Sequence, residues 1–176
     1  APPQPVAPVV EASKKGRKDD KAAPPAPAPL PTIAPAVAEQ FAQAVRSLEA
    51  GDYATARPIL EELAASEPTL AAPAVNLGML HAREGRPAEA ETALAEGIRR
   101  DPESAVALNE IASVQREMGR FEDAESAYRQ ALAADPQHYR THRNFAVLLD
   151  LYLWRPAEAL QHFEAYVSKS GTADRQ

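Results

Sequence analysis

Histidine and carboxylate side chains are the groups in this chain that come nearest to acid–base or metal chemistry. The four histidines are His81, His138, His142 and His162. The second and third stand four residues apart and closely follow Asp135. On a helix, side chains four residues apart lie on one face, so this pair could share a metal ion. We prefer the interpretation that these histidines pack or face solvent, and we expect no metal site.

The other patterns that carry chemistry are missing from the sequence. There is no cysteine, and therefore neither a disulfide nor a thiol nucleophile. There is no glycine-rich phosphate loop, no zinc helix with paired histidines and no serine elbow. The acidic pairs Glu61-Glu62 and Asp19-Asp20 are interpreted as solvated charges. We therefore expect no catalytic residue and no cofactor, and we predict that the protein is not an enzyme.

The feature that organises the chain is a fixed repeat period. Three acidic residue–proline pairs mark it at equal intervals: Glu67-Pro68, Asp101-Pro102 and Asp135-Pro136. Further columns keep the same spacing, and their members are Gly51, Gly85 and Gly119; Tyr53, Pro87 and Phe121; Ala56, Ala90 and Ala124; and Leu60, Leu94 and Tyr128. A fixed period of this length predicts an array of one repeated supersecondary unit.

Each unit has the pattern of two short helices. In residues 105–138, the first apolar stripe comprises Leu108, Ile111, Ala112 and Val114. Gly119 is expected to end that helix, since glycine adopts the left-handed conformation of a helix C-terminus. A second stripe runs from Phe121 to Leu132, and Pro136 stops it. The repeated alanines predict close packing of the two helices.

The fourth unit departs from this pattern by one inserted residue. The segment Arg155-Pro156-Ala157 matches Arg86-Pro87-Ala88, but it stands one position later than two full periods would place it. Trp154 takes the place of the turn glycine. The preferred interpretation is that Leu151, Leu153 and Trp154 cap the end of the array, as terminal repeats often require. The alternative is that Trp154 is an exposed aromatic contact for a partner.

Small residues, glycine and large residues at these offsets, with proline near the end of each unit, resemble the tetratricopeptide repeat. The resemblance implies an all-α solenoid of helix–turn–helix repeats, a right-handed superhelix whose first helices line a concave groove. We predict about four repeats, at residues 37–70, 71–104, 105–138 and 139–172. A disordered Pro/Ala-rich tail is predicted for residues 1–36, which hold ten of the 17 prolines, and a C-terminal tail for residues 173–176.

The resemblance also implies which side chains face the groove. Carried onto this chain, the positions are Phe41, Val45 and Leu48; Val75, Asn76, Met79 and Arg83; Asn109, Glu110, Ser113 and Arg116; and Arg140, Arg143, Asn144, Val147 and Asp150. The groove would be apolar toward its N-terminal end and polar, with arginines, toward its C-terminal end. That composition suits an extended peptide or a partner's helix, with Arg140 and Arg143 able to bind a carboxylate. For each apolar residue, packing between repeats is the alternative.

Charge divides the chain into two parts. The first 36 residues carry five basic and three acidic residues, whereas the rest carries a net charge of −8. An acidic array with few aromatic residues is a poor nucleic-acid binder, so we expect no nucleic-acid partner. The basic run at residues 14–21 is interpreted as a solvated linker, with contact to anionic lipid as the alternative.

We predict a non-catalytic scaffold that binds a partner protein or peptide, located in the periplasm. The leader resembles the mature region of bacterial envelope lipoproteins, whose acylated cysteine would lie just before residue 1 and anchor the chain to the outer membrane. Residues 151–160 resemble the last repeat of small envelope proteins that accompany TonB-type systems. The alternatives are a pilotin-like lipoprotein for a pilus secretin, a self-associating structural module, and a cytoplasmic location.

Overall fold

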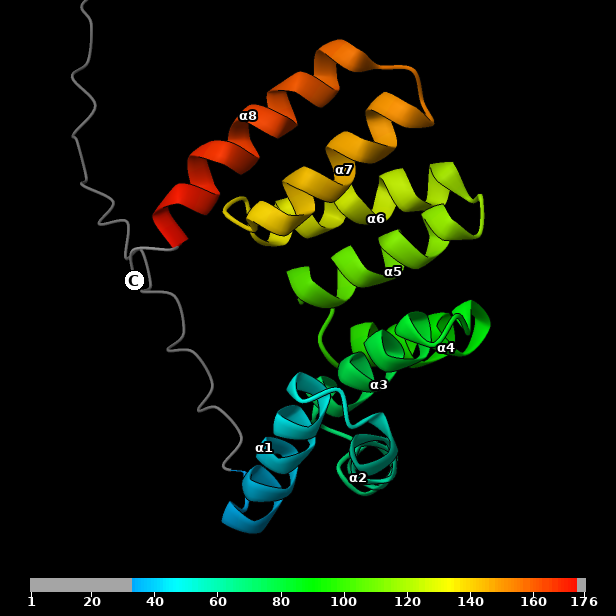
Figure 1. Cartoon of the computed structure of the whole chain (residues 1–176), viewed down its shortest axis with the longest axis vertical. Coiled ribbons are helices and arrows are strands. Elements are labelled where there is room, and N and C mark those ends of the chain that lie inside the picture. Colours follow the sequence, from blue (N-terminus) through cyan, green and yellow to red (C-terminus); the bar gives the residue numbers. More distant parts are fainter. Residues whose placement is uncertain (1–32, 174–176) are drawn as a thin grey trace, which may run out of the picture. The chain divides into compact units, whose positions relative to one another are not determined.

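A computed structural model describes residues 33–173, and every regular element in that range is an α-helix. The helices are α1 (Pro35–Glu49), α2 (Tyr53–Ser66), α3 (Ala71–Arg83), α4 (Pro87–Arg100), α5 (Ala105–Glu117), α6 (Phe121–Ala134), α7 (Tyr139–Leu151) and α8 (Pro156–Ala173) (Figure 1). The prediction of an all-α repeat array is confirmed. The predicted N-terminal tail lies outside the described residues up to residue 32, and α1 begins at Pro35. The predicted C-terminal tail lies outside them from residue 174.

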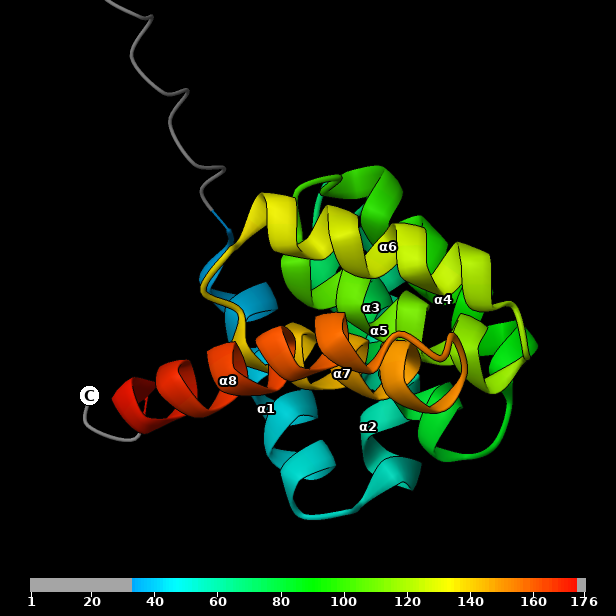
Figure 2. The same ribbon diagram turned by 90° about the horizontal axis from the view of Figure 1, so that it is seen from above.

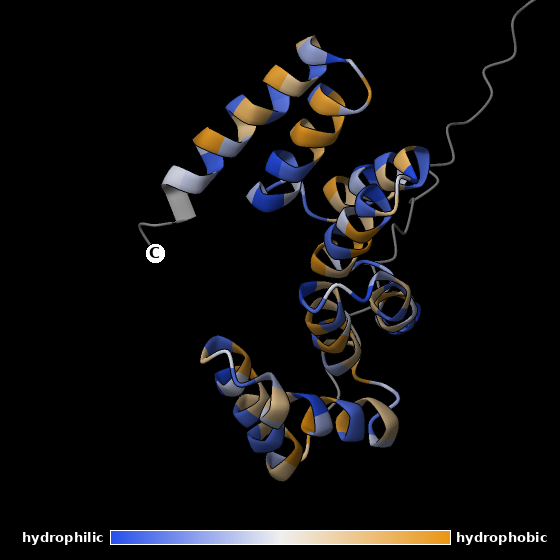
Figure 3. Ribbon diagram, turned by 45° about the vertical axis from the view of Figure 1, so that its right-hand side comes forward, coloured by the Kyte–Doolittle hydropathy of each residue, from blue (hydrophilic) through white to orange (hydrophobic). Residues whose placement is uncertain are grey.

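The helices pack as four hairpins that follow one another in chain order. Contacts are densest within the pairs α1–α2, α3–α4, α5–α6 and α7–α8, and each second helix also contacts the first helix of the next pair. Figures 1 and 2 show α7 and α8 side by side in an antiparallel hairpin. Figure 3 shows hydrophobic and hydrophilic residues on each helix, as expected when only one face is buried.

The turns inside the hairpins follow the glycine column. Gly51, Gly85 and Gly119 have φ values of 76°, 71° and 77°, in the left-handed region that glycine enters without a Cβ clash. Two helix starts are capped by side chains: Asp52 accepts a hydrogen bond from the Thr55 amide, and Ser104 from the Ala107 amide. The helices end two residues before Pro68, Pro102 and Pro136. These local features explain why the hairpins recur at a fixed spacing.

Small residues set how closely the helices of a hairpin approach. The alanine column of the second helices is fully buried through Ala56, Ala90 and Ala124. In the second hairpin, Gly78 and Gly97 sit where any Cβ would collide with the neighbouring helix. A Cβ on Gly97 would lie 2.5 Å from Val75 Cγ2, and one on Gly78 would lie 2.6 Å from Leu94 Cγ. The α3–α4 hairpin therefore depends on glycine at both places.

The core is apolar and runs through all four hairpins. Its largest fully buried side chains include Tyr128, Phe145 and Leu148, and the Tyr128 and Phe145 rings stack with centroids 5.7 Å apart. Buried apolar surface of this kind supplies most of the free energy of folding. Among residues 33–173 there is no helix with the length and apolarity that a membrane span requires.

The turn of the fourth hairpin differs from the other three. Trp154 occupies the place of the turn glycine and has a φ of 54°, although a bulky side chain is strained there. Its side chain is 84% exposed, and Leu151 is 61% exposed. Only Leu153 of this group packs against the core. The predicted capping role is therefore wrong for Trp154 and Leu151, because neither side chain covers the end of the array.

Candidate partner-binding groove

The first helices of the hairpins form a continuous hollowed surface. One hollow of about 210 Å³ lies between α1 and α3 and is lined by Val45, Leu48, Glu49, Asn76, Met79, Leu80 and Arg83. A second hollow of about 280 Å³ spans α3, α5 and α7 and is lined by Met79, Ala82, Arg83, Glu110, Ser113, Val114, Glu117 and Arg140. Because Met79 and Arg83 line both, we treat the two hollows as one feature and call it the groove.

The groove changes character along its length. Its α1–α3 end presents the apolar side chains of Val45, Leu48 and Met79, all half-buried. Its other end presents charged groups, with Arg83 and Arg140 on either side of Glu110. The sequence predicted this gradient from apolar to polar. An elongated ligand with an apolar part and a charged part matches it.

Several side chains predicted to bind a ligand in the groove instead form hydrogen bonds within the protein. Asn109 is only 1% exposed; it donates to Glu110 Oε1 at 3.0 Å and accepts from Asn144 Nδ2 at 3.1 Å. Its amide therefore ties α5 to α7. The Ser113 hydroxyl donates to the Asn109 carbonyl at 3.1 Å and accepts from the Tyr128 hydroxyl at 3.0 Å. Buried polar groups need such partners, so the hydrogen-bonding groups of these residues are used within the protein. They therefore maintain the shape of the groove and do not contact a ligand directly.

The remaining predicted residues are placed individually. Val75 is buried against Gly97 and has little surface to offer a partner. Phe41 and Val147 are half-buried on α1 and α7, and Arg143 is exposed on α7, but none of the three lines either hollow. Asn76 donates to the Ala72 carbonyl at 2.9 Å, which leaves its own side-chain oxygen available to a ligand.

Two arginines of the first helices, Arg140 in the groove and Arg116 outside its lining, lie beside aromatic rings. The guanidinium of Arg140 lies 5.9 Å from the centroid of Tyr139, and its Nε donates to the Tyr139 hydroxyl at 3.3 Å. The guanidinium of Arg116 lies 6.0 Å from the centroid of Tyr152. An aromatic face holds a guanidinium without neutralising its charge. Both arginines are thus restrained in direction while they keep their ability to bind an anion.

Glu110 is the carboxylate placed deepest in the groove. Burial raises its pKa, even though the hydrogen bond from Asn109 and the charges of Arg140 and Arg83 favour its ionised form. A carboxylate in this setting gains from any further cation or donor that a ligand brings. The charged end of the groove therefore contains a negative charge, Glu110, as well as the positive charges of Arg83 and Arg140.

Glu49 and Glu117 line the groove but were not predicted to do so. Both occupy the column of Arg83, near the C-terminal end of a first helix. The repeat itself carries the signal that identifies them, because the column that places Arg83 in the groove places these two carboxylates there as well.

A larger hollow lies away from the groove, between α2, α3 and α4. Its volume is about 660 Å³ and most of its lining is apolar, including Ala64, Leu77 and Ala93. Two of its three carboxylates form ion pairs, Glu89 with Arg86 and Glu96 with two arginines of its own helix, whereas Glu61 has no ion pair among residues 33–173. Volume alone would favour this hollow, or one of about 730 Å³ between α4 and α5, over the groove, but the groove has the charged groups that would specify a ligand.

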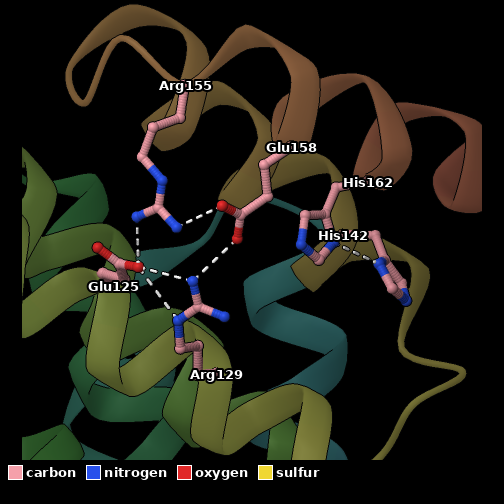
Figure 4. Close-up of polar contacts among 6 residues, drawn as sticks. All are labelled: Glu125, Arg129, His142, Arg155, Glu158 and His162. Atoms are coloured by element: carbon pink, nitrogen blue, oxygen red, sulfur yellow. Dashed lines mark hydrogen bonds and ion pairs between the residues drawn. The ribbon is translucent and has the colours of Figure 1, made fainter.

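The histidines do not gather around one point. His138 Nδ1 lies 2.6 Å from Thr141 Oγ1, whereas His142 Nδ1 lies 2.9 Å from His162 Nδ1 on α8 (Figure 4). The His162 ring also packs against the Phe145 ring at a tilt of 49°, with centroids 4.7 Å apart. Within residues 33–173 no group of three histidine or carboxylate side chains is arranged to hold a metal ion. The histidine pair is a packing contact between α7 and α8.

Comparison with protein families gives one consistent result. The family model of the tetratricopeptide repeat matches residues 41–105, 75–139 and 109–174. Each match begins one repeat period after the match before it, and the last is longer than the others by a single position. The inserted residue beside Trp154 falls within this last match and outside the other two. A comparison with curated proteins finds no match.

Solved structures share the fold at low sequence identity. A crystal structure of MamA is 18% identical with a TM-score of 0.67, and covers 80% of this chain and 81% of that one. A second MamA structure is 19% identical with a TM-score of 0.65, at 79% and 75% coverage. A mutant of the Thermobaculum terrenum O-GlcNAc transferase is 22% identical with a TM-score of 0.62; the match covers 64% of this chain but 22% of that enzyme. At such identities the likeness shows the fold alone.

Proposed function

The chain belongs to the tetratricopeptide-repeat family, and from that premise we propose a non-catalytic scaffold whose groove binds an acidic segment of a partner protein. Repeats of this family bind protein partners. The proposal names the binding face and the chemistry of the segment that it takes. Both follow from how arginine charges are distributed over the helices.

The observation that carries the proposal is the location of the unpaired arginines. Eight of the twelve arginines in residues 33–173 form ion pairs. The four without an ion pair in that range are Arg83, Arg116, Arg140 and Arg143. All four lie on first helices, α3, α5 and α7, at positions expected to face the groove.

The charge balance makes these four arginines unusual. Residues 33–173 contain 21 acidic and 13 basic residues, so unpaired carboxylates are unavoidable whereas unpaired arginines are not. Arginine is always charged and forms its best contacts with a carboxylate in a two-pronged geometry. Four arginines without an ion pair on the first helices can receive an anionic ligand, with Glu110 beside Arg83 and Arg140 as a half-buried carboxylate that such a ligand must avoid. A partner's Asp or Glu side chains, or its C-terminal carboxylate, supply that chemistry.

The orientation of the ligand follows from the gradient in the groove. Apolar side chains of the partner pack on Val45, Leu48 and Met79, and its carboxylates meet Arg140 and Arg143 at the α7 end. The free side-chain oxygen of Asn76 accepts from a backbone amide of the ligand between them. Methionine at the centre accommodates side chains of different shape.

The experiment is a peptide series that varies only in charge. Three labelled peptides of about twelve residues alternate leucine with glutamate, glutamine or lysine, and fluorescence anisotropy measures binding to the full chain. We expect the glutamate peptide to bind tightest, although the array as a whole is acidic and repels it. Changing Arg140→Gln with Arg143→Gln should weaken that binding by about tenfold or more, as loss of charged hydrogen bonds does.

A matched control removes the same charge elsewhere. Arg46→Gln with Arg99→Gln changes two exposed arginines outside the groove by the same total charge. Circular dichroism verifies that both variants stay helical. Equal loss of binding in the two variants would mean that net charge, and not the groove, governs association, and the proposal would be wrong.

We also propose that the scaffold works in a bacterial envelope, as part of a TonB-type assembly. This rests on the sequence alone: the Pro/Ala-rich leader and the resemblance of residues 151–160. A pilotin-like role beside a secretin is the second candidate. Cell fractionation and mass spectrometry of the native protein test both, because an envelope lipoprotein carries an acylated N-terminal cysteine ahead of residue 1. A cytoplasmic, unacylated protein would overturn the envelope assignment.

A further inference from the structure

Each junction between hairpins is tied by an ion pair from one column. Arg57 on α2 pairs with Glu84, Glu91 on α4 pairs with Arg120, and Glu125 on α6 pairs with Arg155. In every case the partner belongs to the turn region of the next hairpin. Figure 4 shows the third junction, where Arg129 and Glu158 extend the network between α6 and α8.

The same column is apolar in α8. Allowing for the inserted residue, the place of Arg57, Glu91 and Glu125 is taken by Leu160, which is 58% exposed. A second column behaves similarly: Ile98 and Leu132 pack against the core from α4 and α6, whereas Val167 at that place is 68% exposed. Leu160 and Val167 are seven residues apart and therefore lie on one face of α8.

We call this surface the α8 outer face. Its members are all exposed and are mostly small or uncharged: Ala157, Leu160, Gln161, Glu164, Val167, Ser168 and Gly171. The last hairpin as a whole is rich in exposed apolar groups. Of the eight large hydrophobic residues exposed in residues 33–173, five lie in it: Leu151, Tyr152, Trp154, Leu160 and Val167. Exposed apolar residues concentrated in one hairpin favour an interaction surface there.

The opposite end of the array is finished differently. One column of the first helices packs toward the preceding hairpin; its members are Leu77, Ile111 and Phe145. Ile111 lies beside α4, and the Phe145 ring lies beneath Arg129 of α6. In α1 the same column holds the exposed Gln43. Gln40, one turn earlier, is exposed as well. The N-terminal end is thus closed by polar residues, while the C-terminal end keeps an apolar face.

We propose that the α8 outer face binds an amphipathic helix of a partner protein that carries a basic residue between two apolar ones. Helices α4 and α6 are covered on the corresponding face by the first helix of the next hairpin, so the docked helix continues a packing that the array already uses. Leu160 and Val167 meet the apolar residues of that helix. Glu164 lies midway between them, is exposed, and has no ion pair among residues 33–173, so it receives the cation.

Charge argues against a second copy of the chain as the occupant. In a two-fold pairing of α8 with its own copy, the midpoint residue Glu164 faces itself, and like charges at close range repel. Head-to-tail stacking fails for another reason, because it brings the polar Gln40 and Gln43 of α1 against the apolar face. A separate helix with a cation satisfies both Glu164 and its apolar neighbours. This inference concerns a different surface from the groove and does not depend on it.

The test uses two stapled helical peptides of about 18 residues, a length that spans the face. Each has leucines seven residues apart, and the residue midway is lysine in one and glutamate in the other. We expect the full chain to bind the lysine peptide about threefold tighter or more. Glu164→Lys should reverse that preference, which a merely structural role of Glu164 would not do.

Apolar contact is tested with a matched pair of double variants. Leu160→Asp with Val167→Asp should weaken both peptides by about tenfold or more, since it removes the apolar contact. Ser126→Asp with Ala133→Asp changes two residues of α6 at the same spacing and should leave binding unchanged. Helicity of all variants is verified by circular dichroism.

Three results would overturn the inference. The first is equal affinity for the two peptides in the parent and in Glu164→Lys. The second is loss of binding in the α6 control. The third is a dimer in light scattering that Leu160→Asp with Val167→Asp dissociates, because the occupant would then be a second copy.

Discussion

At the scale of single residues, Trp154 is the side chain that departs furthest from its surroundings. It holds a positive φ where the other three hairpins use glycine, and its ring is almost fully in solvent. A left-handed conformation costs a bulky residue about 1–2 kcal/mol, and the exposed ring returns little of that through packing. The residue is therefore a cost to the fold, which is what a residue kept for contact with a partner looks like.

The change Trp154→Gly should therefore stabilise the array. Relief of the strained backbone exceeds the extra freedom that glycine gives the unfolded chain, about 0.4–1 kcal/mol, so we expect a net gain of about 0.5–1 kcal/mol. Urea unfolding followed by circular dichroism measures it. Destabilisation by about 1 kcal/mol or more would mean that Trp154 does cap the array.

The histidine pair makes the last hairpin sensitive to acid. Burial, and then the neighbouring His142, lower the pKa of His162 from its ordinary value of 6.5. The unfolded chain therefore takes up a proton at His162 more readily than the folded chain does. The stability that neutral His162 contributes is fully present above the pKa of His162 in the unfolded chain. It declines as the pH falls from that pKa toward the lower pKa of His162 in the folded chain.

Between about pH 7.5 and pH 5.5 we expect the melting temperature to fall. In His162→Gln it should fall less, because glutamine does not titrate. Part of the slope should remain, since burial also lowers the pKa of His81 and His138. Glu110 has a raised pKa and opposes the trend, but it contributes equally to the parent and the variant. Identical slopes in parent and variant would contradict this account of His162.

At the scale of helices and hairpins, two glycines allow α3 and α4 to approach each other closely. Gly97 packs against Val75, and Gly78 packs against Leu94, without room for a methyl group. Gly97→Ala gains about 1 kcal/mol of helix propensity but overpacks the interface, which costs about 1–3 kcal/mol. The expected outcome is net destabilisation, measured by urea unfolding.

Gly171→Ala is the matched control for that change, because a Cβ there meets nothing within 4 Å. It removes a glycine from α8 without overpacking and should be neutral or slightly stabilising. If both variants lost the same stability, helix packing in the second hairpin would be looser than the structure indicates.

The helices were predictable because their signals are local and repeated. The columns of Gly51, Ala56 and Pro68 determine a turn, a close helix contact and a helix end, respectively. Because each column recurs in successive repeats, each repeat supports the assignment made from the others. The site was less predictable. Position within the repeat assigns Asn109 and Val75 to the inner face. It does not reveal that Asn109 is buried and hydrogen-bonded to Asn144, or that Val75 is buried against Gly97, so that neither is available to a ligand. Those outcomes depend on which residue stands opposite, in a different helix.

At the scale of the whole array, residues 33–173 have distinct surfaces for distinct tasks. The first helices carry the four arginines that have no ion pair among residues 33–173, and two of them, Arg83 and Arg140, line the groove. The α8 outer face keeps apolar side chains where α1 has polar ones. Ion pairs between hairpins fix the register of the stack but end at Leu160. From this design we propose that the scaffold binds two different partner segments, one acidic and one basic, at surfaces that do not overlap.

The most direct test of the binding face is to map it residue by residue with the glutamate peptide. Amide chemical shifts of the ¹⁵N-labelled full chain are recorded during titration with that peptide. We predict that the shifts concentrate on α3, α5 and α7, around Met79, Ser113 and Arg140. Shifts centred on the hollow around Ala64 and Ala93, or on α8 around Leu160, with the first helices unperturbed, would contradict the groove as the site where this protein binds an acidic partner.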